Sequence, residues 1–331
     1  MSEPHYGAGG NFKGYLSEED KKKYSTMAAI LAGLFLLAQF TIPFVFMMIF
    51  MPSMMGANIK AMATRCEPAR ATGWKGRVWL VKEGLDGSVP GAKLFKLAPD
   101  MAGDLEEVCE LREGNVWLAP GGDRLWLVGP AYVGYLRGET ITTLSLATEF
   151  GDISPPFLYK DAPALFERTE GGFDLMTFDG KEWQESGSLT MPAPEPESHE
   201  TTRMEAVAEG DEIHLFMNHR LKIYHRKGLP KDGSDLAQWT QVCPSKDAWR
   251  AAEIDGKPAV FAQKMEGMQS RTVGYRKEGG AWKSFFSAPG GMTIQLGVAP
   301  LKGSSFALLT EGFPGSVRVA RVEGGKVVKK R

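Results

Sequence analysis

Hydrophobic and polar positions divide the chain into two parts with different patterns. Residues 27–51 form a run of 25 residues without a formal charge. From about Trp74 onward, short apolar runs alternate with turns rich in Gly, Asp and Pro, and no long segment has the 3.6-residue period of a helix. The pattern therefore predicts one membrane-spanning α-helix followed by an all-β domain.

The uncharged run is long enough to cross a bilayer. At about 1.5 Å per residue it extends about 38 Å as a helix, and the hydrocarbon core is roughly 30 Å thick. Pro43 predicts a kink. Because the run is much longer than the roughly 7–15 apolar residues of a secretory leader, we expect it to remain attached. The predicted organisation is a flexible tail over 1–16, the helix with a short pre-membrane extension over 17–57, and a linker over 58–73.

Charges and small residues give this helix an orientation and a packing face. Four basic residues precede it within reach and three follow, so the positive-inside bias favours a cytoplasmic N-terminus and a periplasmic β domain. No asparagine has Ser or Thr two positions later, so there is no N-glycosylation acceptor, which favours a bacterial inner membrane.

Four small residues recur at helical spacing in this segment, namely Ala28, Ala29, Ala32 and Gly33. Small residues on one face of a helix let another helix approach closely. The alternative is that Ala and Gly are simply common in membrane helices.

The β domain contains six repeats. Alignment of the tight turns that precede its strongest strands makes six residues equivalent, namely Trp79, Trp126, Leu165, Leu215, Val260 and Ala307. Their spacings are 47, 39, 50, 45 and 47 residues. Each unit continues with a third and a fourth strand, and in three units a tryptophan opens the fourth strand. A period of roughly 40 to 50 residues with four strands is typical of a β-propeller blade, so residues 74–331 predict a six-bladed β-propeller.

An aromatic residue after a Gly or Asp turn near the last strand resembles the kelch and Asp-box propeller repeats. The resemblance covers residues 74–331 and implies the propeller fold without selecting one family. The stretch nearest to an Asp-box lies around Asp232, Gly233 and Trp239, with a different spacing. The tryptophans expected to pack between blades, rather than to form a ligand platform, are Trp79, Trp126, Trp183, Trp239 and Trp282. A pair of β-sandwiches is the competing architecture.

Composition and motifs exclude several classes of function. The chain has 39 basic and 40 acidic side chains, so it has no broad positive field and nucleic acid is not expected as a principal partner. The sequence contains no G-x-x-x-x-G-K-[ST], H-E-x-x-H, G-x-S-x-G or S-x-x-K motif. We therefore predict no catalytic residue and no cofactor.

Histidine provides the one cluster of metal-ligating residue types. Four of the five histidines fall within 27 residues, at His199, His214, His219 and His225. His214 and His225 are expected on neighbouring strands and are weak candidates for a transition-metal site. The alternative is that they are ordinary surface and edge histidines.

Three cysteines lie far apart in the sequence and form no C-x-x-C motif. In a six-bladed ring, Cys109 in the first unit and Cys243 in the fourth are too far apart for a disulfide. Cys66 leads into the first unit, so Cys66 and Cys109 are the pair expected to come within reach.

Two functions from different classes follow from these features. In the first, the chain is a non-catalytic membrane-anchored subunit whose partners are membrane lipid and the other subunits of a membrane protein complex, with the propeller as a docking surface. In the second, it is an anchored carbohydrate-binding or glycan-processing propeller with a site in the central funnel. The small-residue face of the anchor and the lack of catalytic motifs favour the first.

Overall fold

The computed structural model describes part of the chain. The chain divides into two units, Met1–Ile59 and Lys60–Arg331, and the second unit contains the β domain. The described residues are 22–23, 25–27, 64–66, 68–84, 91–98, 101, 105–111, 115–130, 132–145, 150–192, 202–229, 232–244, 248–266, 269–290, 293–312 and 316–330.

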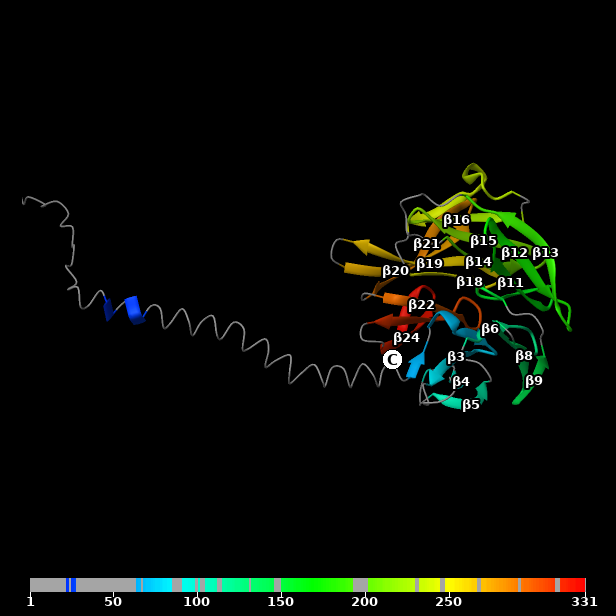
Figure 1. Cartoon of the computed structure of the whole chain (residues 1–331), viewed down its shortest axis with the longest axis horizontal. Coiled ribbons are helices and arrows are strands. Elements are labelled where there is room, and N and C mark those ends of the chain that lie inside the picture. The colour runs from blue at the N-terminus through cyan, green and yellow to red at the C-terminus, as the bar shows by residue number, and fades with distance from the viewer. Residues whose placement is uncertain are drawn as a thin grey trace, which may run out of the picture. The chain divides into compact units, whose positions relative to one another are not determined.

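Every β-sheet of the second unit is built from strands that are consecutive in the sequence (Figure 1). Blade 1 consists of β1 (Thr64–Cys66), β2 (Thr72–Trp74), β3 (Arg77–Gly84), β4 (Gly91–Leu97) and β5 (Glu106–Leu111). Blade 2 consists of β6 (Trp117–Pro120), β7 (Leu125–Gly129), β8 (Tyr132–Arg137) and β9 (Thr140–Ser145). Blade 3 consists of β10 (Phe157–Tyr159), β11 (Ala162–Arg168), β12 (Gly172–Phe178) and β13 (Trp183–Thr190).

The second half of the unit repeats this plan. Blade 4 consists of β14 (Arg203–Glu209), β15 (Glu212–His219), β16 (Lys222–Lys227) and β17 (Thr240–Pro244). Blade 5 consists of β18 (Trp249–Ile254), β19 (Lys257–Glu266), β20 (Gln269–Glu278) and β21 (Ala281–Gly290). Blade 6 consists of β22 (Thr293–Pro300), β23 (Phe306–Gly312), β24 (Ser316–Glu323) and β25 (Lys326–Lys330). All these pairings are antiparallel.

The six residues aligned from the sequence all lie on the strand next to the innermost position of their blade, on β3, β7, β11, β15, β19 and β23. The turns before five of these strands, all except β7, contain residues in the left-handed conformation. Lys160 and Asp161 have φ of 51° and 65°, and Gly256 has φ of 71°. The predicted six-fold repeat is therefore confirmed.

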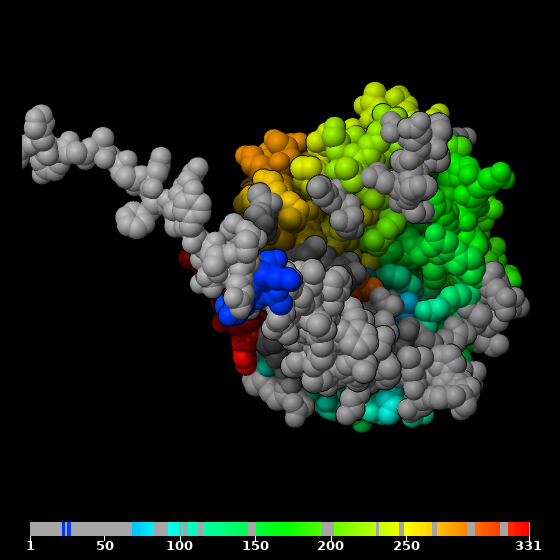
Figure 2. All heavy atoms as spheres, turned by 60° about the vertical axis from the view of Figure 1, so that its left-hand side comes forward, coloured from blue at the N-terminus to red at the C-terminus, as the bar shows by residue number. Residues whose placement is uncertain are grey.

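The first strands of the six blades form a closed ring. Strands β2, β6, β10, β14, β18 and β22 each contact the next in this order, and β22 contacts β2. Six separate sheets around one centre exclude the pair of β-sandwiches. In the space-filling view, the green, yellow and orange parts of the chain, from blades 3 to 5, lie side by side around the rim (Figure 2).

Blades 1 and 6 close the ring without sharing a strand, since each of the described strands pairs only within its own blade's sheet. Instead, their backbones approach closely at two glycines. A Cβ atom on Gly73 of β2 would lie 1.4 Å from the carbonyl oxygen of Pro300, and one on Gly297 of β22 would lie 1.8 Å from that of Pro68. No side chain fits at either position.

Apolar side chains fill the spaces between neighbouring blades. Trp126 and Trp183 belong to one cluster with residues of blades 2 and 3, and their rings both lie within 6.1 Å of the Phe178 ring. Trp79 lies in the cluster between blades 1 and 2, Trp239 between blades 3 and 4, and Trp282 against the cluster between blades 4 and 5. Burial of these faces is what makes single four-stranded sheets stable as a ring.

Blade 1 begins earlier in the sequence than predicted. Strands β1 and β2, and the short 3₁₀-helix η1 (Pro68–Arg70) between them, fall within residues 58–74, most of which the sequence predicted as a linker. Both strands pair with β3, so together they occupy the innermost position of the sheet.

The predicted membrane span at 27–51 lies outside the described residues except for Met27. The packing face at Ala28, Ala29, Ala32 and Gly33 also lies outside them. Across the described ranges, no helix is long and apolar enough to cross a bilayer.

Candidate binding site

The ring of first strands surrounds a central channel. Because each of these strands opens an up-and-down blade, all six run in the same direction, and their first residues lie at one end of the channel. We call this end the channel mouth. Strand β1 also reaches this end, because Thr64 pairs with Gly84, the last residue of β3. The chain therefore enters the propeller at the channel mouth.

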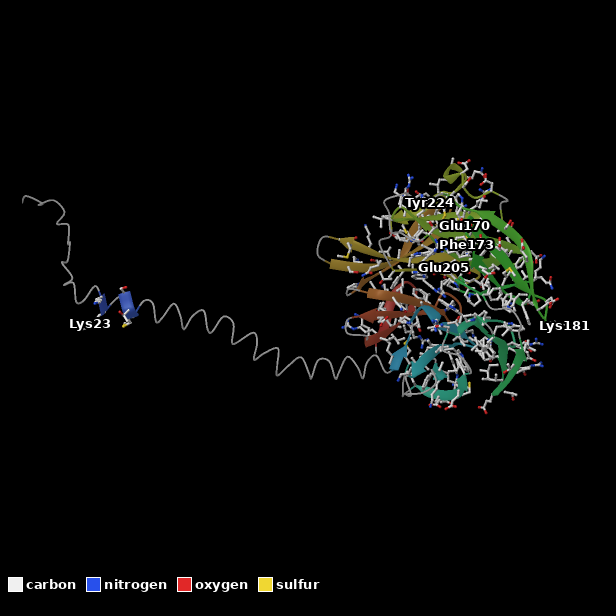
Figure 3. All side chains as sticks on the ribbon, in the orientation of Figure 1. Lys23, Glu170, Phe173, Lys181, Glu205 and Tyr224 are labelled. Carbon is white, nitrogen blue, oxygen red and sulfur yellow. The ribbon has the colours of Figure 1, made fainter. Side chains whose placement is uncertain are left out.

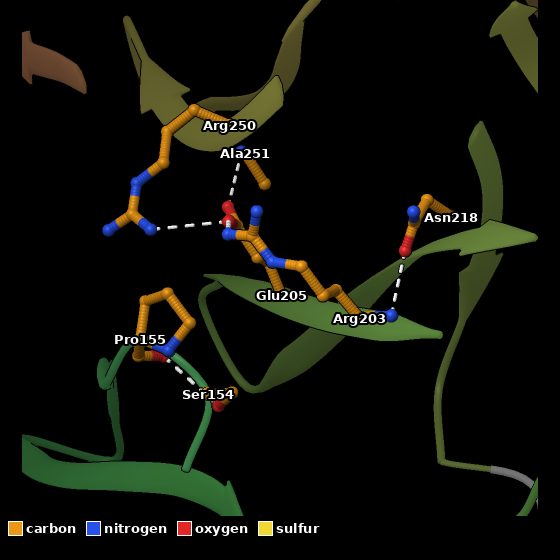
Figure 4. A network of polar contacts seen from close by, with 7 residues as sticks. All are labelled: Ser154, Pro155, Arg203, Glu205, Asn218, Arg250 and Ala251. Carbon is orange, nitrogen blue, oxygen red and sulfur yellow. Dashed lines mark hydrogen bonds and ion pairs between the residues drawn. The ribbon is translucent and has the colours of Figure 1, made fainter. Parts of the chain in front are cut away.

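A buried ion-pair network lies at the mouth between blades 4 and 5 (Figure 4). Glu205 has only 2% of its side chain exposed. Its Oε1 accepts hydrogen bonds from Nη1 of Arg250 at 3.2 Å and Nη2 of Arg203 at 3.4 Å. Its Oε2 accepts one from the backbone N–H of Ala251 at 2.7 Å. Figure 3 shows Glu205 toward the middle of the propeller and Lys181 at its rim.

Arg250 extends across the channel. Its guanidinium carbon lies 5.3 Å from the ring centroid of Trp117, the first residue of β6. Blades 2 and 5 are opposite each other in a ring of six, so this cation–π contact bridges the channel mouth. Arg70 of η1 contacts the same indole at 5.5 Å and donates a hydrogen bond to Asn115 at 2.9 Å. The mouth is therefore closed by side chains from four blades.

The Arg203–Glu205–Arg250 network carries a net positive charge. Two guanidinium groups share the one carboxylate of Glu205. Burial lowers the pKa of Arg250, the Glu205 carboxylate raises it, and Arg203 lowers it. Arg250 still remains charged at any ordinary pH.

Beneath the network, the channel contains a cavity of about 130 Å³. All six first strands contribute to its walls, which combine polar surface with apolar side chains such as Leu118, Ala206, Val298 and Ala252. Arg250 and Glu253 are its charged lining residues. Burial raises the pKa of Glu253, and nearby Glu209 raises it further.

A second, larger cavity of about 810 Å³ lies between blades 3 and 4, which we call the blade 3–4 cleft. It is at the opposite end of the propeller, beside the turns that follow Tyr159 and precede Glu212. The ammonium nitrogen of Lys160 lies 5.0 Å from the centroid of the Tyr159 ring. Lys227 pairs with Glu212, and the hydroxyls of Thr177 and Ser186 lie 2.5 Å apart. The cleft thus combines two aromatic residues, Tyr159 and Phe178, with hydroxyls and balanced charges.

The two histidines predicted on neighbouring strands come together. Nδ1 of His214 on β15 and Nε2 of His225 on β16 share a hydrogen bond of 2.9 Å, and both residues are buried. Nε2 of His214 lies 3.0 Å from a carboxylate oxygen of Glu209. Burial lowers the pKa of His214, and burial together with His214 lowers the pKa of His225 to about 3. Both are therefore neutral at physiological pH.

The described residues contain no group of three or more His, Cys, Asp or Glu side chains arranged to hold a metal ion. His219 is buried at the end of β15, and His199 lies outside the described residues. The His214–His225 pair instead packs against Trp282 of blade 5, with its ring 5.0 Å from that of His225.

The cysteine pairing expected from the sequence does not fit the sheet. Cys66 is on β1 and Cys109 on β5, at opposite edges of blade 1 with β3 and β4 between them. Strand spacings of about 4.8 Å put their backbones roughly 14 Å apart, beyond the roughly 7 Å limit for a disulfide. Cys109 and Cys243 are free thiols, and burial raises their pKa values to about 11 and about 12.

The mis-spaced Asp-box stretch forms a turn that links blades 3 and 4. Oδ1 of Asp232 accepts hydrogen bonds from Ser234 and from the hydroxyl of Thr190 on β13, the latter at 2.9 Å. The indole N–H of Trp239 donates to the carbonyl of Gly233 at 3.0 Å. This aspartate therefore has a structural role in the turn before β17.

No family model and no curated protein matches the chain. Solved structures resemble it at low sequence identity. The SapL1 lectin in complex with alpha methyl fucoside has a TM-score of 0.50 at 10% identity, over 80% of this chain and 96% of that one. The fucose-specific lectin from Aleuria aurantia has a TM-score of 0.51 at 11% identity, over 82% and 95%. The β-propeller domain of the Trilobed protease from Pyrococcus furiosus has a TM-score of 0.41 at 12% identity, over 80% and 83%.

The likeness is one of fold. No specific family follows from it. The residues at the mouth were not predicted from the sequence, because Glu205 and Arg250 lie in short strands whose alternating polar positions look like ordinary solvent-facing ones.

Proposed function

We propose that the chain is a non-catalytic, membrane-anchored subunit of a larger membrane protein complex, with the propeller docking on its partners at the channel mouth. The uncharged run at 27–51 supports the anchor. A bacterial inner membrane with the propeller on the periplasmic side agrees with the flanking charges.

The observation that carries the docking role is the Arg203–Glu205–Arg250 network. Its groups are held by the first strands of two blades and by a contact with a third, so it is rigid before any partner binds. Arg203 has 46% of its side chain exposed, and Asn115 beside the mouth is also exposed. A preorganised surface of this kind gives specificity and a fast association rate with an acidic partner.

Purification from membranes in mild detergent tests this proposal. We expect the full chain to co-migrate with a stoichiometric membrane complex, and Arg203→Ala to weaken that association. The matched control is Arg137→Ala, since Arg137 is an exposed arginine at the end of β8, away from the mouth. A chain that migrates alone, or equal association of both variants, would contradict the docking role.

A second candidate function is carbohydrate binding, and the blade 3–4 cleft favours it. Its volume of about 810 Å³ falls in the usual range for small-ligand sites, whereas the channel cavity of about 130 Å³ is below that range. Under this proposal the site is the cleft rather than the central funnel. Two of the proteins similar in fold are lectins, one of them in complex with alpha methyl fucoside.

A glycan array with the full chain tests the second candidate. We expect saccharide binding that Tyr159→Ala abolishes, because an aromatic face in a cleft stacks on the apolar face of a sugar. Binding that survives Tyr159→Ala, or no binding to any glycan, would exclude the cleft as a lectin site.

A further inference from the structure

The guanidinium of Arg250 has unused hydrogen-bond donors in a buried place. Arg250 has 12% of its side chain exposed and lines the channel cavity. Among the described residues, only its Nη1 has a hydrogen-bond partner, the carboxylate of Glu205. In Figure 4 the other terminal nitrogen points away from Glu205. A guanidinium has five N–H donors in a planar fork, so one edge of the fork is available to a planar anion.

The charge around Arg250 also favours an anion. Glu205 neutralises only one of the two guanidinium groups that it contacts. Glu253, the other charged lining residue, is three residues further along β18, about 10 Å from Arg250 at the usual rise per residue, so it lies away from the fork.

The rest of the cavity is small and partly apolar. Apolar side chains such as Leu118, Ala208 and Val298 line the cavity. Its volume of about 130 Å³ is below the roughly 300–1,000 Å³ of sites for drug-sized ligands. The space therefore suits a carboxylate with a very short aliphatic tail.

We infer that the channel binds a small aliphatic monocarboxylate, of the size of acetate or propionate, with its carboxylate on the free edge of Arg250 and its tail against the apolar walls. This ligand site is separate from the proposed docking role and does not depend on it. The bound anion completes the neutralisation of the Arg203–Arg250 pair.

Calorimetric titration of the full chain in mild detergent with sodium propionate, at constant ionic strength set by sodium chloride, tests the inference. We expect saturable binding of one propionate per chain. Arg250→Met keeps the apolar stem and removes the donors, so binding should weaken at least tenfold. The control Arg137→Met should bind like the parent, because Arg137 has 66% of its side chain exposed and is away from the cavity.

A second variant tests the cavity without removing Arg250. Ala208 is half-buried and lines the cavity, so Ala208→Leu narrows it while the ion pairs remain. In a series from acetate to octanoate, the parent should reject the long acids, and Ala208→Leu should shift this limit to shorter ones. Absence of saturable propionate binding, or a series in which every acid binds equally to the parent and to Ala208→Leu, would overturn the inference.

Discussion

The seam between blades 1 and 6 depends on the absence of a side chain at Gly297. In Gly297→Ala the new Cβ would lie 1.8 Å from the carbonyl oxygen of Pro68, and real Cβ atoms essentially never come closer than 3.0 Å to such an atom. The two backbones must therefore separate by at least 1.2 Å, the difference between these distances. Because blades 1 and 6 share no strand within the described ranges, the movement directly opens the ring.

The expected cost is large for a single methyl group. Overpacking in a well-packed interior typically costs about 1–3 kcal/mol, and we expect the upper end because the contact is with backbone rather than with a flexible side chain. For a domain of this size, about 1 kcal/mol lowers Tm by about 2–4 °C, so Gly297→Ala should lower Tm by about 6–12 °C.

The assay is thermal unfolding followed by intrinsic fluorescence, with Gly171→Ala as the matched control. Gly171 lies in the turn between β11 and β12, where an added Cβ meets nothing within 4 Å. The control should change Tm by less than about 2 °C. Hydrogen exchange should locate the weakened protection in β2 and β22. Equal melting of the two variants would refute the close packing of the seam.

Three further predictions address the network, the histidine pair and the anchor. Glu205→Ala leaves Arg250 buried without its counter-ion and should destabilise the propeller by about 3–5 kcal/mol in thermal melts. The control Glu323→Ala breaks an exposed pair with Arg321 and should cost less than about 1 kcal/mol. Similar losses of stability in the two variants would contradict the importance of the network. The pKa of His225 falls from 6.5 when unfolded to about 3 when folded, so its neutral form stabilises the protein above pH 6.5 and this stability is lost as pH falls toward 3. At pH 5 the loss is about 2 kcal/mol, and denaturant titration should show that His225→Phe reduces this dependence; an unchanged pH profile would exclude it. The full chain should stay in the membrane pellet after alkaline carbonate extraction, and its release would refute the anchor at 27–51.

The fold was largely predictable because the repeat is local. Turn residues and strand-length apolar runs recur in every unit, so the equivalence of Trp79 and Trp126 appears in the sequence and holds in the structure. The inner strands of blade 1 were missed because residues 64–74 have no apolar run. Here pairing with the edge of β3 determines the strands, together with the close approach at Gly73, which arises only when the ring closes.

The candidate site was less predictable because it is assembled from distant parts of the chain. Trp117, Glu205 and Arg250 come together through ring closure, and no local spacing connects them. His214 and His225 were placed on neighbouring strands because one hairpin contains both. Their mutual hydrogen bond and burial depend on Trp282 of the next blade, which the hairpin alone does not reveal.

Site-specific photo-crosslinking in native membranes tests the docking role most directly. A photoreactive residue at Asn115, exposed beside the channel mouth, should capture one defined membrane protein, and the same residue at Asp255, exposed in the turn between β18 and β19 at the opposite end, should not. Capture of a single partner from Asn115 alone is the predicted result. Equal capture from both positions, or capture from Asp255 only, would contradict it.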